Sequence, residues 1–93
     1  MKTDTYKPIH PGAILRDEIK SVGVTIQDVA DAIGVQRTNL SLLVNGHASL
    51  STEMAVRISE CLGKSPEFWL NLQMHYDVKM IDRKALNVKR LKG

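Results

Sequence analysis

The stretch that decides the fold is DVADAIGVQRTNLSLLVNG, residues 28–46. It holds two short apolar patterns on either side of one glycine, Gly34. The first pattern starts just upstream and follows one face of a helix that begins after the N-capping residue Thr25, with apolar residues Ile26, Val29, Ala30 and Ile33. The second predicts a helix over 36–44 with inward-facing residues Leu40, Leu43 and Val44. The sequence therefore predicts two short helices joined by a turn at Gly34.

This pair of helices has the size and patterning of a helix-turn-helix unit. Ala30 is expected where the two helices cross, because a small side chain lets them approach each other. In such units the second helix lies in the major groove of DNA, whose width admits an α-helix. Small helical cores that contain such a pair also occur in proteins that bind no DNA, so the pattern of the two helices alone does not decide the function.

The polar side of the 36–44 helix carries side chains that suit base edges. Arg37 is expected to donate two parallel hydrogen bonds to guanine O6 and N7. Gln36 and Asn39 are candidates for adenine, and Thr38 for a base edge or a thymine methyl group. These four residues are therefore the predicted sequence-reading residues.

Three further candidate DNA-binding residues lie in the second half of this helix or directly after it. Ser41 and Asn45 lie further along and suit phosphate oxygens. Leu42 lies on the polar side, where it either contacts a thymine methyl group or is a singly exposed leucine of the kind common on protein surfaces. Positive charge is sparse here, because Arg37 is the only basic residue of the helix.

Helical periodicity extends on both sides and predicts an all-α protein of five helices. The other helices are expected over about 12–21 with Val22 on the buried side, after the N-cap Ser51 up to Gly63, and from Pro66 to about Lys79. Cys61 is expected as a small core residue of the fourth helix. The fifth helix has four apolar anchors, which are Phe68, Trp69, Leu72 and Tyr76.

The 93 residues suit one small domain, divided into an N-terminal arm (1–8), a helix-turn-helix domain (9–78) and a basic tail (79–93). The formal net charge of +3 is unevenly distributed, since the tail carries +5 and the rest −2. Such a tail binds nucleic acid or an acidic protein surface, or is simply solvated. A chain this short buries a modest core, which favours a homodimer.

Several classes of protein are not indicated. No apolar run approaches the roughly 20 residues of a membrane span, and the N-terminus resembles no secretory signal, so a cytoplasmic protein without membrane contact is expected. The single cysteine allows no internal disulfide. The three histidines are far apart, at His10, His47 and His75, and predict no metal site. No catalytic residues and no cofactor are expected.

Three segments together resemble the HigA antitoxins, also called VapI-like, of the XRE group of phage-repressor-like helix-turn-helix proteins. They are HPGAILRDEI (10–19), DVADAIGVQRTNLSLLVNG (28–46) and LSTEMAVRISECLGKSPEFWLNLQ (50–73). The block SPEFWLNLQ (65–73) is the most specific, and HPG (10–12) is nearly as distinctive. The resemblance covers about residues 9–73.

The resemblance implies a five-helix, lambda-repressor-like fold and a dimer formed largely through the C-terminal half. It implies binding to the operator of a type II toxin–antitoxin operon and inhibition of a HigB/RelE-like mRNA-cleaving toxin. By motif, Gln27 matches a position that touches phosphate, and DNA contacts fall on Gln36, Arg37, Thr38 and Ser41. The packing and dimer-supporting positions match Phe68, Trp69 and Leu72.

Two other functions stay open on the residues alone. One is a stand-alone XRE-type regulator without a toxin. The other is a protein-interaction module whose helix-turn-helix is vestigial.

The segment HASLS (47–51) departs from the family pattern, because it carries less basic charge than many members of the family have after the NG turn.

Overall fold

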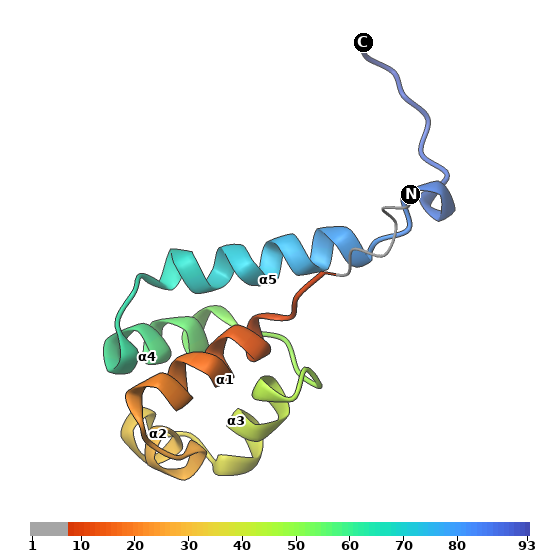
Figure 1. Cartoon of the computed structure of the whole chain (residues 1–93). Helices are drawn as coiled ribbons and strands as arrows, with labels where there is room; N and C mark the ends of the chain where they lie inside the picture. Colours follow the sequence, from red (N-terminus) through yellow and green to blue (C-terminus); the bar gives the residue numbers. More distant parts are fainter. Residues whose placement is uncertain (1–7) are drawn as a thin grey trace.

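The computed structural model describes residues 8–93, and these residues form helices without any β-strand. Figure 1 shows the helices in order: α1 (Pro11–Val22), α2 (Ile26–Ile33), α3 (Arg37–Val44), α4 (Thr52–Leu62), α5 (Pro66–Met80) and a short 3-10 helix, η1 (Arg83–Leu86). The predicted all-α fold with five helices is confirmed. Of the predicted arm 1–8, only Pro8 lies within the described residues.

Serine and threonine hydroxyls fix the start of three helices. Thr25, Ser51 and Ser65 accept hydrogen bonds from backbone amides of the first turns of α2, α4 and α5, at 3.0–3.1 Å. Each hydroxyl satisfies one of the amides that a helix start leaves without a partner. These caps set the helix boundaries, and α3 begins one residue later than expected because Gln36 is its N-cap.

The helix-turn-helix unit lies on one side of the core. Gly34 ends α2 with a positive φ of 76°, and its N–H donates to the carbonyl of Ala30, so the chain reverses within a few residues. Ala30 is fully buried, as its position at the helix crossing requires. The core around it consists of Leu15, Ile19, Val29, Ile33, Leu40, Leu43, Val44, Leu50, Ala55, Ile58 and Trp69.

The segment His10–Pro11–Gly12 joins α1 to α3 and α5. The backbone amide of Gly12 donates to Nδ1 of His10 at 2.9 Å, while Pro11 opens α1 at a position that needs no amide donor. Burial is the main reason why the pKa of His10 lies below its usual value, which keeps the ring neutral and Nδ1 free to accept. The ring also stacks edge-on against Tyr76 of α5, with centroids 4.8 Å apart.

A buried glutamine attaches α5 to the link between α3 and α4. Oε1 of Gln73 accepts a hydrogen bond from the backbone amide of Leu50 at 2.7 Å, and its Nε2 donates to Asp77 at 2.8 Å. Both ends of this buried amide therefore have partners, as burial of a polar group demands. The contact fixes the chain that leaves α3.

Three side chains expected in the interior are on the surface. Val22 is 52% exposed because α1 ends there, and the following turn at Gly23 leads the chain away. Cys61 is exposed, so it is not a core residue. Phe68 is 38% exposed and packs its ring edge-on against that of the buried Trp69.

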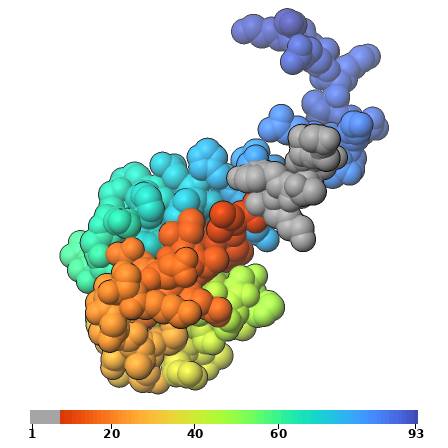
Figure 2. Space-filling view, viewed as in Figure 1, coloured from red at the N-terminus to blue at the C-terminus, as the bar shows by residue number. Residues whose placement is uncertain are grey.

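The end of the chain leaves the body of the protein. α5 continues to Met80, so the tail begins two residues later than expected, and after η1 the chain has no regular structure. Figure 2 shows this segment projecting away from the packed helices. No helix in residues 8–93 is both long and apolar enough to cross a membrane.

Gly12 makes the tightest backbone contact of the glycines in the described chain, and this contact yields a prediction. A Cβ at this position would lie 1.8 Å from the carbonyl oxygen of Leu43 in α3. Replacing a helical glycine with alanine normally stabilises a helix by about 1 kcal/mol. We expect Gly12→Ala to destabilise the protein instead, by about 1–3 kcal/mol, because α1 and α3 must move apart. Urea unfolding followed by circular dichroism measures this change.

The neighbouring exposed position supplies the control. Ala13→Gly is expected to lower stability by about 0.5–1 kcal/mol, the ordinary propensity difference between the two residues. A Gly12→Ala protein as stable as the wild type would contradict the close approach of α1 and α3.

Candidate DNA-binding surface

The exposed side of α3 carries the polar residues that the sequence singled out. Arg37, Thr38 and Asn39 occupy its first turn and are exposed, directly after the exposed N-cap Gln36. Leu42 is 42% exposed on the same helix, while Leu40 and Leu43 are buried. The predicted division of α3 into an apolar and a polar side is therefore present.

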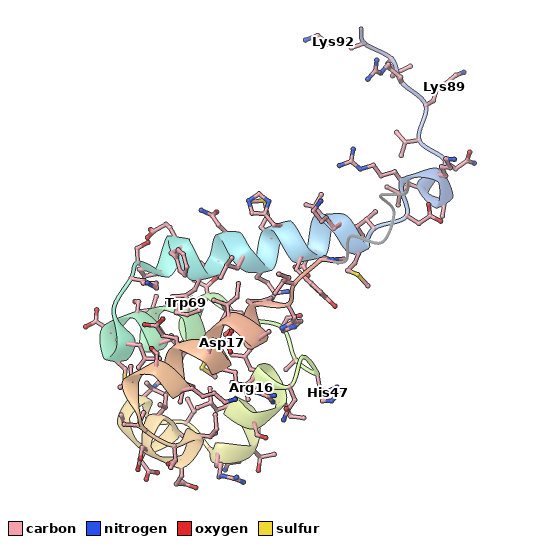
Figure 3. All side chains as sticks on the ribbon, in the orientation of Figure 1. Arg16, Asp17, His47, Trp69, Lys89 and Lys92 are labelled. Carbon is pink, nitrogen blue, oxygen red and sulfur yellow. The ribbon has the colours of Figure 1, made fainter. Side chains whose placement is uncertain are left out.

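The end of α3 is tied to α1 by side chains. Nδ2 of Asn45 donates to the backbone carbonyl of Ser41 at 2.9 Å and lies 3.3 Å from its hydroxyl oxygen. Oδ1 of Asn45 accepts a hydrogen bond from the guanidinium of Arg16, whose side chain reaches from α1 toward α3 (Figure 3). Asn45, predicted together with Ser41 to suit phosphate oxygens, thus holds an arginine in place, and Ser41 in turn binds the Asn45 amide.

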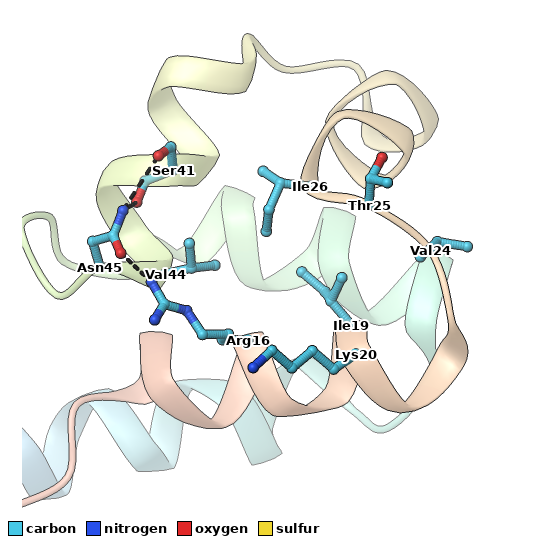
Figure 4. Close-up of a pocket in the computed structure, with 9 residues that line it drawn as sticks. All are labelled: Arg16, Ile19, Lys20, Val24, Thr25, Ile26, Ser41, Val44 and Asn45. Carbon is cyan, nitrogen blue, oxygen red and sulfur yellow. Dashed lines mark hydrogen bonds between the residues drawn. The ribbon is translucent and has the colours of Figure 1, made fainter.

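Arg16 belongs to a shallow hollow of about 330 Å³ between α1, α3 and the start of α2, shown in Figure 4. We call it the basic hollow, because two cationic side chains and no acidic one line it. Its lining consists of Arg16, Ile19, Lys20, Val24, Thr25, Ile26, Ser41, Val44 and Asn45. The start of α2 lies at its edge, where helical amides carry partial positive charge.

The start of α2 is held by a reciprocal pair of hydrogen bonds. The backbone amide of Asp28 donates to the Thr25 hydroxyl, and the Thr25 amide donates to the Asp28 carboxylate, each at 3.0 Å. The hydrogen bond from the Thr25 amide, and next the Thr25 side chain, lower the pKa of the Asp28 carboxyl below its usual value. Asp28 therefore has a structural role at the start of α2.

Gln27, the predicted phosphate ligand of α2, is exposed and directly precedes Asp28 in the first turn of the helix. Its Nε2 donates to the carboxylate of Asp31 at 2.9 Å, which orients the amide along the helix surface. One N–H of this amide group remains for a ligand, since the group carries two.

The sequence interpretation missed Arg16 and Lys20. Both lie on α1, 12 and 8 residues before the stretch 28–46, and only the packing of α1 on α3 brings them beside the exposed side of α3. Their spacing of four residues, which places both on one side of a helix, was the available signal.

The residues predicted to support packing and the dimer lie away from the candidate DNA-binding surface, on α5. Trp69 is buried, whereas Leu72 and Tyr76 are half-buried and Phe68 is exposed. Figure 3 places Trp69 between α5 and the helices below it. Within residues 8–93 no group of three or more metal-ligating side chains comes together.

The chain matches the model of a family described as Helix-turn-helix over residues 15–69. Antitoxin HigA-1 of Vibrio cholerae is 35% identical over 79 residues, which cover 84% of this chain and 74% of that protein. Virulence-associated protein I of Dichelobacter nodosus is 32% identical over 83 residues, covering 86% of this chain and 77% of the relative.

Two solved structures are similar over almost the whole chain. The Pseudomonas aeruginosa antitoxin HigA with the higBA promoter has a TM-score of 0.86 at 29% identity, covering 92% of this chain and 100% of that one. The antitoxin GraA in complex with its operator has a TM-score of 0.84 at 35% identity and covers both chains completely. This is a family of DNA-binding antitoxins and regulators and not of enzymes. The chain belongs to the helix-turn-helix family and, within it, to the group of HigA and VapI-like antitoxins.

Proposed function

We propose that the protein is the antitoxin of a type II toxin–antitoxin system, which represses its own operon as a homodimer and neutralises an mRNA-cleaving toxin of the HigB/RelE class. The observation that carries the DNA-binding part is the basic hollow beside the exposed polar side of α3. One surface thus combines groups for base edges with groups for phosphates, as specific DNA binding requires.

Sequence recognition is assigned to the first turn of α3. Arg37 has the bidentate geometry that suits guanine, and Gln36 and Asn39 have side-chain amides that suit adenine. Thr38 has both a hydroxyl and a methyl group for a neighbouring base. Leu42, one turn further, is placed for a thymine methyl group if α3 lies lengthwise in the groove.

Phosphate binding is assigned to the basic hollow. Arg16 and Lys20 supply two charges, and the Thr25 hydroxyl and the start of α2 add polar groups at its edge. The Asn45 amide holds Arg16 in position, so less freedom is lost when the guanidinium meets a phosphate. These two residues of α1 provide the charge that α3 itself lacks.

Relatives support the choice of DNA and of a toxin. One structural relative is described with a promoter and another with its operator, and both are named antitoxins. A toxin that cleaves mRNA is the partner that the HigA resemblance implies. A reading frame for a small basic ribonuclease next to this gene would support that partner, and its absence would favour a stand-alone regulator.

The outer side of α5 is the proposed dimer interface. Met74 and Val78 lie one turn apart on the side opposite the buried Trp69, and they are 47% and 43% exposed. Two apolar residues on the open side of a helix are suited to packing against the same helix of a second copy. A dimer presents two recognition helices, which read two half-sites about one DNA turn apart.

Arg37 tests the recognition helix. We expect Arg37→Ala to weaken binding to DNA from upstream of the gene by about 1–3 kcal/mol, or roughly 5- to 150-fold, and to relax preference at one guanine. Fluorescence anisotropy with this DNA, with single-base variants and with scrambled DNA measures both effects. Unchanged affinity and preference would favour the vestigial helix-turn-helix.

Arg16 tests the basic hollow. Arg16→Ala should weaken binding to all DNA sequences about equally and reduce the slope of log affinity against log salt by about 1 per DNA-bound subunit, because one phosphate contact is lost. The control is Lys64→Asn, which removes a positive charge at the α4–α5 link and tolerates the positive φ of that residue. An effect of Arg16→Ala confined to one base pair would contradict its assignment to phosphate.

Met74 tests the dimer. Met74→Glu places a charge in the proposed interface, and we expect a monomer in sedimentation velocity and weaker operator binding. Ala13→Glu, which adds the same charge at an exposed position of α1, should leave the dimer intact. A Met74→Glu protein that sediments as a dimer would contradict this interface.

A further inference from the structure

A second hollowed surface lies between α2 and α4, and it borders the basic hollow at Val24. Two adjoining hollows share Ala32 and Cys61 and together form one channel, which we call the acidic groove. Its lining consists of Val22, Val24, Asp28, Val29, Ala32, Ile33, Val56, Arg57, Glu60, Cys61 and Leu62. Val22 lines one of the two hollows and Val56 the other, and they are 52% and 42% exposed.

The charge around this groove is mainly negative. α2 carries Asp28 and Asp31 without any basic residue, and α4 adds Glu60 to the lining, while Glu53 of α4 is paired with Arg57. The only basic side chain of the lining is already occupied, because Arg57 binds the Glu53 carboxylate at 2.8 and 3.0 Å and the carbonyl of Ile33 at 2.6 Å. The groove therefore suits a segment that is both apolar and basic, and it repels DNA.

The tail of this chain, residues 81–93, has that composition. It carries five basic residues against the single acid Asp82. Among them stand Leu86, Val88 and Leu91, which are 56%, 80% and 92% exposed. Figure 3 shows Lys89 and Lys92 on this segment, well away from the packed helices. A tail that only bound phosphates would need no apolar side chains, so this composition favours a protein surface as its partner.

We propose that the tail of one copy docks in the acidic groove of a second copy. Val88 and Leu91 cover the apolar floor around Ala32 and Cys61, while the lysines and arginines of the tail face the acidic residues of α2 and α4. This inference rests on the homodimer of the proposed function and adds a second contact to it. It also assigns a role to the basic tail that is separate from DNA.

The arrangement of the helices favours a second copy over the tail's own body. The groove reaches Leu62, four residues before α5 begins, whereas the tail starts at the far end of α5 (Figure 1). If two α5 helices pack antiparallel around Met74 and Val78, the partner's tail emerges beside the middle of this α5 and can run toward its start and the groove. The 13 residues of the tail span up to about 43 Å when extended, which exceeds the length of α5 at about 22 Å.

The single native cysteine provides the test, because Cys61 lies in the groove. In the full-length Val88→Cys variant, mild oxidation with oxidised glutathione should form a disulfide between Cys61 of one copy and the new cysteine of the other. Non-reducing gels should then show a covalent dimer. The matched control combines Val88→Cys with Cys61→Ser and should give at least tenfold less dimer. Equal amounts of dimer in the two variants would overturn the proposal.

Two further outcomes are decisive. A disulfide that closes within one chain, visible as a monomer of altered mobility, would overturn the assignment to a second copy. The absence of any disulfide involving Cys61 would overturn docking in the groove. Sedimentation of the unmodified protein separates these results from the proposed function, because a dimer that forms without this disulfide leaves the α5 interface standing.

A second variant avoids engineered cysteines. Val88→Asp/Leu91→Asp in the full chain should release the tail and raise the rate at which Cys61 reacts with a thiol reagent by at least fivefold. Circular dichroism checks that the helices remain folded. An unchanged rate in a folded protein would overturn the proposal, since the groove would then be open in the wild type as well.

Discussion

The close approach of Gly12 to the carbonyl of Leu43 is the constraint on which the rest of the structure depends. It leaves no room for a side chain, so α1 and α3 lie against each other with only backbone between them at this point. His10 completes the junction, because its ring accepts the Gly12 amide and stacks against Tyr76 of α5. Three helices that are far apart in the sequence are therefore fixed relative to one another by three consecutive residues. The segment HPG is thus a packing element and not only the turn that leads into α1.

The DNA-binding surface follows from this junction. Arg16 and Lys20 lie one and two turns after Gly12, so the side of α1 that touches α3 also carries the two cations of the basic hollow. A recognition helix with one basic residue would bind DNA weakly, because phosphate contacts supply much of the affinity. In the proposed function, charge from α1 resolves that difficulty without placing further cations on α3, whose exposed positions remain available for reading bases. Specificity and affinity would then come from different helices, which one backbone contact aligns.

Local signals account for what the sequence predicted well. Thr25, Ser51 and Ser65 cap three helices, and Gly34 supplies the turn, so the helix boundaries follow from short stretches of chain. The errors concern tertiary packing. Val22 and Cys61 follow the periodicity of their helices but have no neighbouring element to cover them. Arg16 was missed because its place beside Asn45 depends on a contact across 29 positions of the sequence. No sequence pattern predicts the path of the tail, because its residues do not pack against the helices of the described chain and so need no regular spacing of apolar residues.

The two hollows of this small protein differ in charge because α2 presents different residues to each. The start of α2, with Thr25 and Ile26, borders the basic hollow, whereas Asp28 and Ala32 line the acidic groove. An acidic residue near a DNA-binding surface weakens binding, but the Asp28 carboxylate is held in the capping box by the Thr25 amide and is not part of the lining of the basic hollow. The same carboxylate therefore stabilises the start of α2 and contributes negative charge to the acidic groove. In the proposed function, this difference in charge directs nucleic acid and a protein segment to two different hollows of a chain of 93 residues.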